Sequence, residues 1–374
     1  DETLTEFMEH VHNDKMATDT APKFGTTMLF GITSAMGGLG TRNFQTGYFE
    51  NADKISGEAL KETWLVKGRA CFWCPVGQDR FSIVTRGEFA GTWVAGPEYA
   101  TLTNQGCRVG NDNLAAIIKA NEICNRLGLD TYSAGGVIGF AYELYQRGLL
   151  TKMDTDGLEL TWGNYRTQLQ LIERIAYRKG LGNILAEGVR NAAKKIGKGS
   201  EYYAMHIKGL EYPSRDPRGC KEYGVCCSIS QRGADHLYAL NNCYWFRSIP
   251  EKTKEMFGTE RAADGHSPEG KGRMTKWSEE GMALVDMVGV CKLFWNFWVD
   301  DAFKSIYRRT AIIPRLFSAV TGIETGYEKL LIAIHRLTTL EKAYNMREKG
   351  TGRKDDNVPE RFMKEPMPEG PARV

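Results

Sequence analysis

Two cysteines are separated by two intervening residues in the stretch "ACFWCPVGQDRF", residues 70–81. Thiolates with this spacing ligate metals or clusters, or act as a redox-active pair. Pro75 follows the second cysteine, and no third cysteine follows within the stretch. Cys71 and Cys74 therefore predict metal, cluster or redox chemistry, with any remaining ligands drawn from elsewhere in the chain.

Three kinds of site are compatible with this pair. A thioredoxin-like dithiol needs a βαβ pattern, which the surrounding sequence does not show. A zinc site needs four Cys or His ligands, and the adjacent Cys226 and Cys227 are poorly spaced for chelation. An iron–sulfur cluster often combines a local cysteine group, with proline after one member, and a remote cysteine. Cys291 is available as that remote ligand.

Two further stretches share a pattern centred on glycine. Residues 125–130, "NRLGLD", and 286–291, "DMVGVC", both read polar-x-x-Gly-aliphatic-polar after an apolar helical run. Glycine tolerates the left-handed conformation that ends many helices. Asp130 and Cys291 are then expected just beyond a helix end, free to point into a cleft. The pattern taken alone favours a plainer interpretation, two ordinary helix ends.

Candidates for proton transfer lie in two other stretches. His206 and Lys208 alternate in "AMHIKGLE", so an extended backbone would place both on one side. A histidine beside a cation is a candidate proton carrier, although a lone histidine is more often structural. Glu98 and Tyr99 follow a Gly-Pro turn, where a solvated turn glutamate is the simpler interpretation.

The elements that must position these residues are mainly helical. Residues 113–126 are apolar on more than one side, which indicates a buried helix, and apolar residues recur at helical spacing within 137–145, 185–196 and 327–337. Ser133 is predicted to cap the second of these helices, and Thr325 with Glu328 has the spacing of a capping box before the last. Residues 81–87 and 91–96 predict one short hairpin. The sequence thus predicts a mainly α fold with at most a short β-hairpin.

Two segments are predicted to be peripheral. Residues 248–279 are charged and glycine-rich, which indicates a surface insertion, and residues 349–374 are proline-rich, which indicates an extended tail. Two aromatic stretches, "CYWFRS" (243–248) and "LFWNFW" (293–298), could shape a cavity, although core packing is the commoner role for such residues.

The overall composition excludes several classes of protein. The chain has 374 residues, of which 42% are hydrophobic and 25% charged, with a net charge of +3, as in ordinary globular proteins. No Lys/Arg-dense run indicates nucleic-acid binding, and no apolar run of about eighteen residues indicates membrane insertion. The polar N-terminus is not that of a signal peptide. The nine scattered cysteines fit a reducing compartment, so a cytoplasmic location is predicted.

Nine segments, in order along nearly the whole chain, resemble the tungsten-containing aldehyde:ferredoxin oxidoreductase family. The resemblance implies two mainly helical domains, residues 1–182 and 183–374, which cover two pterin dithiolenes. It also implies a β-containing pterin-base domain that has no counterpart in these residues, so a fragment, or a second polypeptide that supplies this domain, is expected. The matching segments are 39–60, "CFWCP" (71–75), "GPEY" (96–99), 125–148, 184–197, "AMHIKGLE" (204–211), "DPRG" (216–219), "DMVGVCK" (286–292) and "RKDDNVPERF" (353–362).

The resemblance assigns cofactor contacts to the two glycine-centred stretches. They match the paired pterin-binding motifs of the family, with Gly289 in the second. Asp130 and Asp286 would accept hydrogen bonds from pterin N–H groups, and Lys208 would lie near a pterin. Asn125 stands where the first motif usually has Asp, so one acceptor has lost its charge.

The resemblance also assigns the residues around the metal. His206 would lie near the tungsten as a proton donor or acceptor. Glu98 and Tyr99 belong to the segment that lines the active site in the family. Many relatives continue that segment with a second Glu, whereas this chain has Ala100, which weakens the assignment of a general base to this segment.

The cysteine pair departs from the family pattern. The family places a third cysteine four residues after the second, and here that position is Gln78, a poor cluster ligand. Three outcomes follow: a cluster held by Cys71, Cys74 and Cys291 with Asp79 as the fourth ligand, a three-iron cluster, or no cluster. We favour the first.

The implied reaction is the oxidation of an aldehyde with water to a carboxylic acid. The implied cofactors are tungsten, or molybdenum, in a bis-pterin dithiolene complex, a 4Fe–4S cluster, and Mg²⁺ bridging the pterin phosphates. Electrons would pass to ferredoxin or another iron–sulfur subunit in an anaerobic organism, and a homo- or hetero-oligomer is expected. Two alternatives stay open, an aromatic acyl-CoA reductase-like catalytic subunit and a non-catalytic, divergent family subunit.

Overall fold

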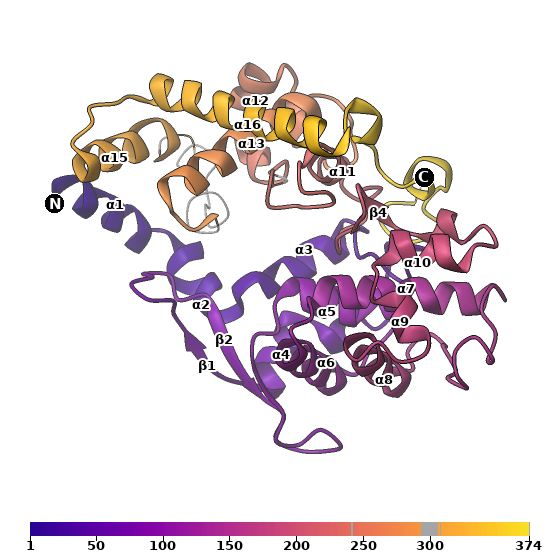
Figure 1. Cartoon of the computed structure of the whole chain (residues 1–374). Coiled ribbons are helices and arrows are strands. Elements are labelled where there is room, and N and C mark those ends of the chain that lie inside the picture. Colours follow the sequence, from indigo (N-terminus) through magenta and orange to yellow (C-terminus); the bar gives the residue numbers. More distant parts are fainter. Residues whose placement is uncertain (241, 293–305, 307, 374) are drawn as a thin grey trace.

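The prediction of a mainly helical chain is confirmed. A computed structural model describes residues 1–240, 242–292, 306 and 308–373 (Figure 1); the stretch 293–298 lies outside these residues. The α-helices are α1 (Glu2–His12), α2 (Ala21–Phe24), α3 (Leu29–Ala35), α4 (Gly57–Thr63), α5 (Tyr99–Gln105), α6 (Leu114–Leu127), α7 (Thr131–Gln146), α8 (Tyr165–Ala176), α9 (Leu181–Leu185), α10 (Val189–Ile196), α11 (Lys221–Ile229), α12 (Pro250–Phe257), α13 (Lys271–Val288), α15 (Ile313–Thr321), α16 (Tyr327–Lys349) and α17 (Glu360–Lys364).

The strands form two small antiparallel sheets. One has the order β1 (Leu65–Arg69), β2 (Asp79–Ile83), β3 (Trp93–Ala95), and the other pairs β4 (His206–Ile207) with β5 (Leu210–Glu211). The predicted hairpin is β2–β3, in which Phe81 pairs with Ala95. Strand β1 is not predictable from the sequence, because most of its residues are exposed and show no apolar alternation.

The helices form a lower and an upper group in Figure 1, in which α2 to α10 lie mostly below and α11 to α16 lie above. In the lower group α5 packs on α7 and α6 on α8, and in the upper group α13 packs on both α11 and α16. One cluster of buried apolar residues runs from Val109 to Ala204 and so crosses the expected boundary at residue 182. The two-domain division stays a prediction.

The two glycine-centred stretches end helices in the same way, as predicted. Gly128 follows α6 with φ 68° and ψ 30°, and Gly289 follows α13 with φ 73° and ψ 32°. In both, the N–H after the glycine reaches back to a carbonyl of the last turn, at 2.9 Å for Leu129 to Cys124 and 2.9 Å for Val290 to Val285. The pattern that the two stretches share in sequence therefore corresponds to a shared backbone geometry at the helix end.

Two predicted helix caps are wrong. Asp130, not Ser133, caps α7, because its carboxylate accepts the N–H groups of Tyr132 at 3.3 Å and Ser133 at 2.9 Å. No side-chain hydrogen bond caps α16 at Gly326. Thr325 is instead tied to α15, since its N–H donates to the hydroxyl of Ser318 at 3.1 Å.

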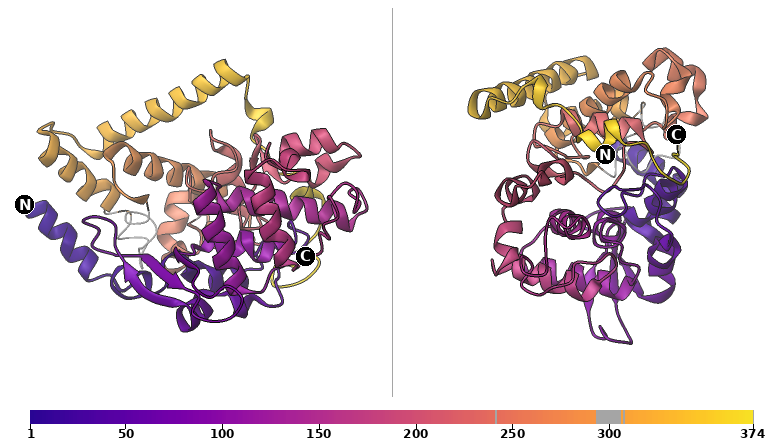
Figure 2. Two further views of the ribbon diagram at one scale, coloured as in Figure 1. Left: turned by 60° about the horizontal axis from the view of Figure 1, so that its bottom comes forward. Right: turned by 90° about the vertical axis from the view of Figure 1, so that its right-hand side faces the viewer.

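The two segments that were predicted to be peripheral, 248–279 and 349–374, both contribute buried residues. The predicted insertion at 248–279 contains α12 and the start of α13, and it buries Phe257, Ala262 and Met274 in a core cluster. The prediction is wrong because the charged residues lie between the apolar ones and conceal their spacing. Figure 2 shows the yellow C-terminal segment passing along the body of the molecule. It includes α17, where Arg361 is fully buried and Phe362 is 8% exposed, so only part of the tail is extended.

No helix in the described part of the chain is long and apolar enough to cross a membrane.

Candidate functional site

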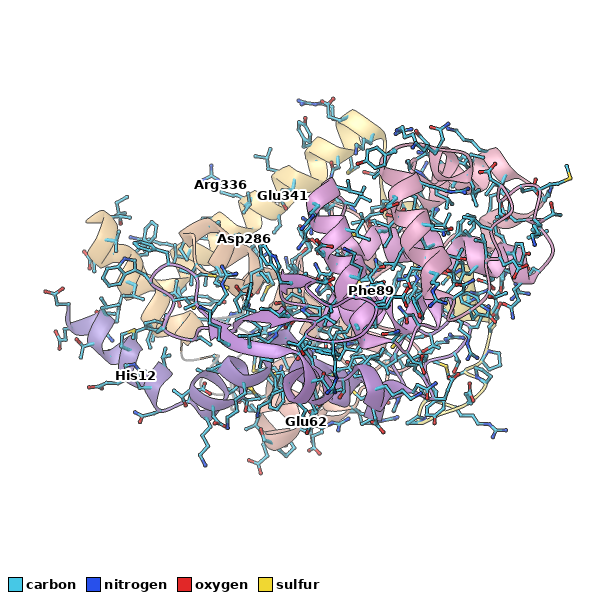
Figure 3. The ribbon with its side chains drawn as sticks, turned by 90° about the horizontal axis from the view of Figure 1, so that it is seen from below. His12, Glu62, Phe89, Asp286, Arg336 and Glu341 are labelled. Atoms are coloured by element: carbon cyan, nitrogen blue, oxygen red, sulfur yellow. The ribbon has the colours of Figure 1, made fainter. Side chains whose placement is uncertain are left out.

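A cavity of about 520 Å³ lies between the start of α5, the end of α13 and residues 236–240. We call it the α5–α13 cavity. Four residues predicted from the sequence line it, namely Glu98, Tyr99, Asp286 and Cys291, which come from opposite halves of the chain. Asp286 lies toward the middle of the view in Figure 3, whereas His12 and Arg336 lie nearer its edges.

Glu98 is held in place by two partners. One carboxylate oxygen accepts a hydrogen bond from the Arg80 guanidinium at 3.0 Å, and the other accepts the hydroxyl of Thr26. Arg80 is 1% exposed, so Glu98 provides the charge that this buried cation needs. A carboxylate has further acceptor sites, and the Glu98 side chain remains 40% exposed. It can still accept a proton or a hydrogen bond on the cavity side.

Tyr99 is the first residue of α5, and its side-chain hydroxyl is both buried and unpaired among the described residues. Its backbone N–H donates to the hydroxyl of Thr26 at 2.9 Å, which fixes the start of the helix beside Glu98. The side chain is 7% exposed, and its hydroxyl is buried without a hydrogen-bond partner in the described part of the chain. An unpaired buried hydroxyl costs about 1–3 kcal/mol, so a ligand group that reached it would be stabilised, but in this structure the oxygen itself is closed off from solvent.

His236 lines the same cavity and is absent from the predicted site. Burial is the main cause that lowers its pKa to about 4, so the ring is neutral at pH 7. It lies in "QRGADH", an irregular segment in which Asp235 accepts the N–H of Leu237 at 2.8 Å. The segment has no periodicity, so only its turn residues, Gly233 and Asp235, mark it as a loop that could carry a functional side chain.

The end of α13 is joined to this loop. Lys292 Nζ donates to the carbonyl of Leu237 at 2.8 Å and pairs with the carboxylate of Asp286 at 2.7 Å. Asp286 is nevertheless 57% exposed, and Cys291 is exposed. The left-handed turn at Gly289 thus leaves a carboxylate before it and a thiol after it, both at one cavity.

The structure places His206 and Lys208 elsewhere. They line a different cavity of about 720 Å³, together with Arg190 and Asp355. Burial, with contributions from Arg190 and Lys194, lowers the pKa of His206 to about 4. Lys208 Nζ donates to the carbonyls of Ser228 at 2.8 Å and Ser230 at 2.7 Å and pairs with Asp356. Neither His206 nor Lys208 is among the residues that line the α5–α13 cavity.

Asn125 and Asp130 lie at the end of α6 and are exposed. Both carboxylate oxygens of Asp130 are used to cap α7. A ligand could therefore reach Asp130 only through its remaining lone pairs.

The cysteine pair lies in the connection between β1 and β2. Cys71 is exposed, Cys74 is half-buried, and the N–H of Cys74 donates to the carbonyl of Cys71 at 3.0 Å. Asp79 lies 3.5 Å from the Arg69 guanidinium, and Gln78 has a buried side-chain oxygen without a partner in the described part of the chain. Among the described residues, no group of three or more His, Cys, Asp or Glu side chains is arranged to hold a metal ion. The four predicted cluster ligands are not brought into one such group.

Comparison with known families matches residues 2–374 to the family described as "Aldehyde ferredoxin oxidoreductase, domains 2 & 3". A tungsten-containing aldehyde ferredoxin oxidoreductase of Thermococcus kodakarensis is 35% identical over 375 residues, which cover 98% of this chain and 57% of the relative. Its counterpart in Pyrococcus abyssi is 34% identical over 379 residues, 99% of this chain and 57% of the relative. The chain therefore spans less than two thirds of these relatives.

A solved structure also resembles the chain. It is described as "Active site complex BamBC of Benzoyl Coenzyme A reductase in complex with 1,5 Dienoyl-CoA", with a TM-score of 0.70, 20% identity, and coverage of 98% of this chain and 59% of that chain. At this identity the likeness concerns the fold alone.

Proposed function

The chain belongs to the aldehyde ferredoxin oxidoreductase family, and from this premise we propose that it forms the larger part of a tungsten-containing oxidoreductase. The proposed reaction converts an aldehyde and water into a carboxylic acid, two protons and two electrons. The observation that carries the proposal is the α5–α13 cavity, which brings Glu98, Tyr99, His236 and Asp286 to one place. These are the kinds of side chain that bind a carbonyl group and transfer protons.

The side chains of the cavity fit a pterin-bound metal. Asp286 offers an exposed carboxylate, which suits the N–H groups of a pterin, and the Tyr99 hydroxyl has no partner among the described residues. A tungsten ion held by pterin dithiolenes would supply the two-electron acceptor. Tungsten is favoured over molybdenum by the names of the relatives. The roles of Asp130, Asn125, Gly289 and Lys208 toward a pterin, and of Mg²⁺, stay predictions from the resemblance.

The side chains that line the cavity have two proposed tasks, to handle protons and to bind the substrate. His236 and Glu98 are the groups that hold or move protons, and Arg80 fixes the position of Glu98. The Tyr99 hydroxyl donates a hydrogen bond to an oxygen of the substrate. His206 faces a different cavity, so we assign to His236, as a donor toward the substrate, the place that was predicted for His206.

The iron–sulfur cluster stays a prediction. Cys71, Cys74, Cys291 and Asp79 are the proposed ligands, and they are not gathered into one group among the described residues. We therefore derive no step through the cluster. We also propose, from the resemblance alone, that ferredoxin or another iron–sulfur subunit accepts the electrons. The same applies to a polypeptide that supplies the pterin-base domain. The fold likeness alone gives no support to an acyl-CoA reductase activity.

Metal analysis tests the main proposal. The protein is purified with its partners from its own source under anaerobic conditions, and tungsten, molybdenum and pterin are quantified per chain. We expect tungsten with about two pterins, and loss of aldehyde-dependent reduction of a viologen dye on replacement of His236 by Ala. If the preparation holds neither metal, the chain is the non-catalytic family subunit and the proposal fails.

Iron and acid-labile sulfide in the same preparation decide the cluster question. If a cluster is present, Cys291→Ser should remove its absorbance and paramagnetic signal, because a remote thiolate is lost. The matched variant Cys124→Ser removes a buried thiol that is not a proposed ligand and should keep the signal. A signal that survives in the Cys291 variant would refute the ligand assignment.

A further inference from the structure

A tyrosine behind the α5–α13 cavity contacts the ring of His236. The hydroxyl of Tyr132, in α7, lies 3.3 Å from Nδ1 of His236. The two rings are nearly parallel, with 2° between their planes and 5.9 Å between their centres. The imidazole is thus held on one side, and Nε2 is the nitrogen left for a ligand.

The direction of this hydrogen bond follows from the other partners of Tyr132. The backbone N–H of Ser214 lies 3.3 Å from the Tyr132 oxygen and can only donate to it. The Tyr223 hydroxyl lies 3.5 Å away. If Tyr132 donated to Tyr223, the Tyr223 hydroxyl could direct its own proton only toward the α5–α13 cavity, which Tyr223 also lines. The side chain of Ser214 is a further hydrogen-bond partner of Tyr132.

One arrangement gives each of these protons an acceptor within the described protein, without a ligand in the cavity. Ser214 and Tyr223 both donate to the Tyr132 oxygen, and Tyr132 donates its own proton to His236 Nδ1. A neutral imidazole carries one proton. Because Nδ1 accepts, that proton must be on Nε2.

We propose that Tyr132 is a positioning residue that fixes His236 as the Nε2–H tautomer, so that His236 presents a hydrogen-bond donor to the oxygen of a carbonyl or carboxylate ligand in the cavity. The inference rests on the proposed function for the identity of the ligand, but not for the tautomer. His236 then polarises the carbonyl of an aldehyde and stabilises negative charge on its oxygen. Removal of a proton from water falls to Glu98.

Nitrogen NMR tests the tautomer without reference to activity. The full chain, with any partner that co-purifies, is labelled with ¹⁵N-histidine, and the signals of His236 are assigned by comparison with His236→Gln. We expect Nε2 to be protonated and Nδ1 to be bare in the wild type at pH 7. A proton on Nδ1 would overturn the proposal.

Two variants on α7 show whether Tyr132 is the cause. Tyr132→Phe removes the donor and should give a mixture of tautomers. Tyr142→Phe is the matched control, because it also removes a buried hydroxyl, one that donates to the carbonyl of Asn164 at 2.8 Å. This control should keep the Nε2–H tautomer. If Tyr132→Phe also keeps it while circular dichroism shows a folded chain, the positioning role is wrong.

Two amide variants test the direction of donation in the active holoenzyme. Glutamine places its N–H₂ near Nε2, and asparagine places it near Nδ1. His236→Gln should therefore keep kcat about 10-fold above that of His236→Asn, with a smaller difference in KM, because a donor toward developing charge acts mainly on kcat. Equal kcat values for the two variants would refute donation from Nε2. Absence of any aldehyde activity in the wild type would instead refute the proposed function and leave the NMR result to decide the tautomer.

Discussion

At the scale of single residues, burial decides which side chains are available for chemistry. Tyr99 has a buried hydroxyl without a partner among the described residues, whereas Lys208 has three partners and is fully engaged. Both are candidates on sequence grounds, and the sequence does not reveal this difference. Glu98 and Tyr99 could be predicted because their segment resembles the one that lines the active site in the family. His236 could not, because its role depends on Tyr132, which is distant in the sequence and close in space.

The two histidines with lowered pKa values predict an acid-sensitive fold. Burial lowers the pKa of His206 from 6.5 to about 4. The unfolded chain therefore binds more protons between these pH values, so the free energy of unfolding falls as the pH drops through that window and is fully present above it. Denaturant titrations should show a smaller decrease for His206→Gln, by at most about 3 kcal/mol.

A control separates this effect from the loss of any imidazole. His12 on α1 is exposed, and His12→Gln should keep the wild-type dependence on pH. If His206→Gln also keeps it, then folding does not disfavour the charged form of His206.

The exposure of the thiols predicts a labelling pattern. Cys71 and Cys291 are exposed, whereas Cys107, Cys226 and Cys227 are buried, and burial raises the pKa of the Cys107 thiol. A maleimide reagent should therefore modify Cys71 and Cys291 rapidly in the metal-free protein and leave the buried thiols until the chain unfolds. Peptide mass spectrometry measures the order. Early labelling of Cys107 would contradict its burial in the folded chain.

At the scale of elements, the sequence predicted the positions of the helices better than it predicted which residues pack against them or cap them. The glycines that end α6 and α13 were predictable because left-handed backbone is a local property. The burial of 248–279 was not, since Phe257 and Met274 are defined as core residues only by what packs on them. The predicted cap at Thr325 failed for the same reason, because the backbone N–H of Thr325 bonds to Ser318 of α15 and α16 begins after Gly326.

The glycine ends predict a specific cost of substitution. A Cβ at Gly128 or Gly289 would meet no atom within 4 Å, so any effect comes from backbone strain. Gly128→Ala and Gly289→Ala should each lower the free energy of unfolding by about 1 kcal/mol, measured by urea denaturation. A Cβ at Gly272 in α13 would also meet no atom within 4 Å, and Gly272 has no left-handed φ. Gly272→Ala should be neutral or stabilising, and a loss equal to that at Gly289 would contradict the strain argument.

At the scale of the whole molecule, a buried ion pair joins distant parts of the chain. Arg361 of α17 and Glu143 of α7 are both fully buried, and the guanidinium donates two hydrogen bonds to the carboxylate, at 2.9 and 2.5 Å. Asn43 donates to the same carboxylate at 2.7 Å. No local pattern could predict this network, because its members are brought together only by the finished fold.

Removing one charge from this network should be strongly destabilising. Glu143→Gln would leave the buried Arg361 with only the partly exposed Glu365 carboxylate, 3.2 Å from its Nε, as counter-charge, so the cost should be near the lower end of about 3–5 kcal/mol. Chemical denaturation of the metal-free chain measures the change. Glu360→Gln breaks an exposed pair with Lys364, in which the side chains are 65% and 66% exposed, and should cost less than about 1 kcal/mol. Similar losses for the two variants would show that burial does not govern the strength of these pairs.

The attachment of the C-terminal segment also has a consequence for synthesis on the ribosome. Arg361 donates to the carbonyl of Asn43, and the N–H of Gly47 lies 2.9 Å from the sulfur of Met367. The segment that contains Asn43 and Gly47 is translated long before its partners, which lie 318 and 320 residues later in the sequence. Nascent residues 43–47 can therefore reach their final packing only after residues 361–367 have left the ribosome.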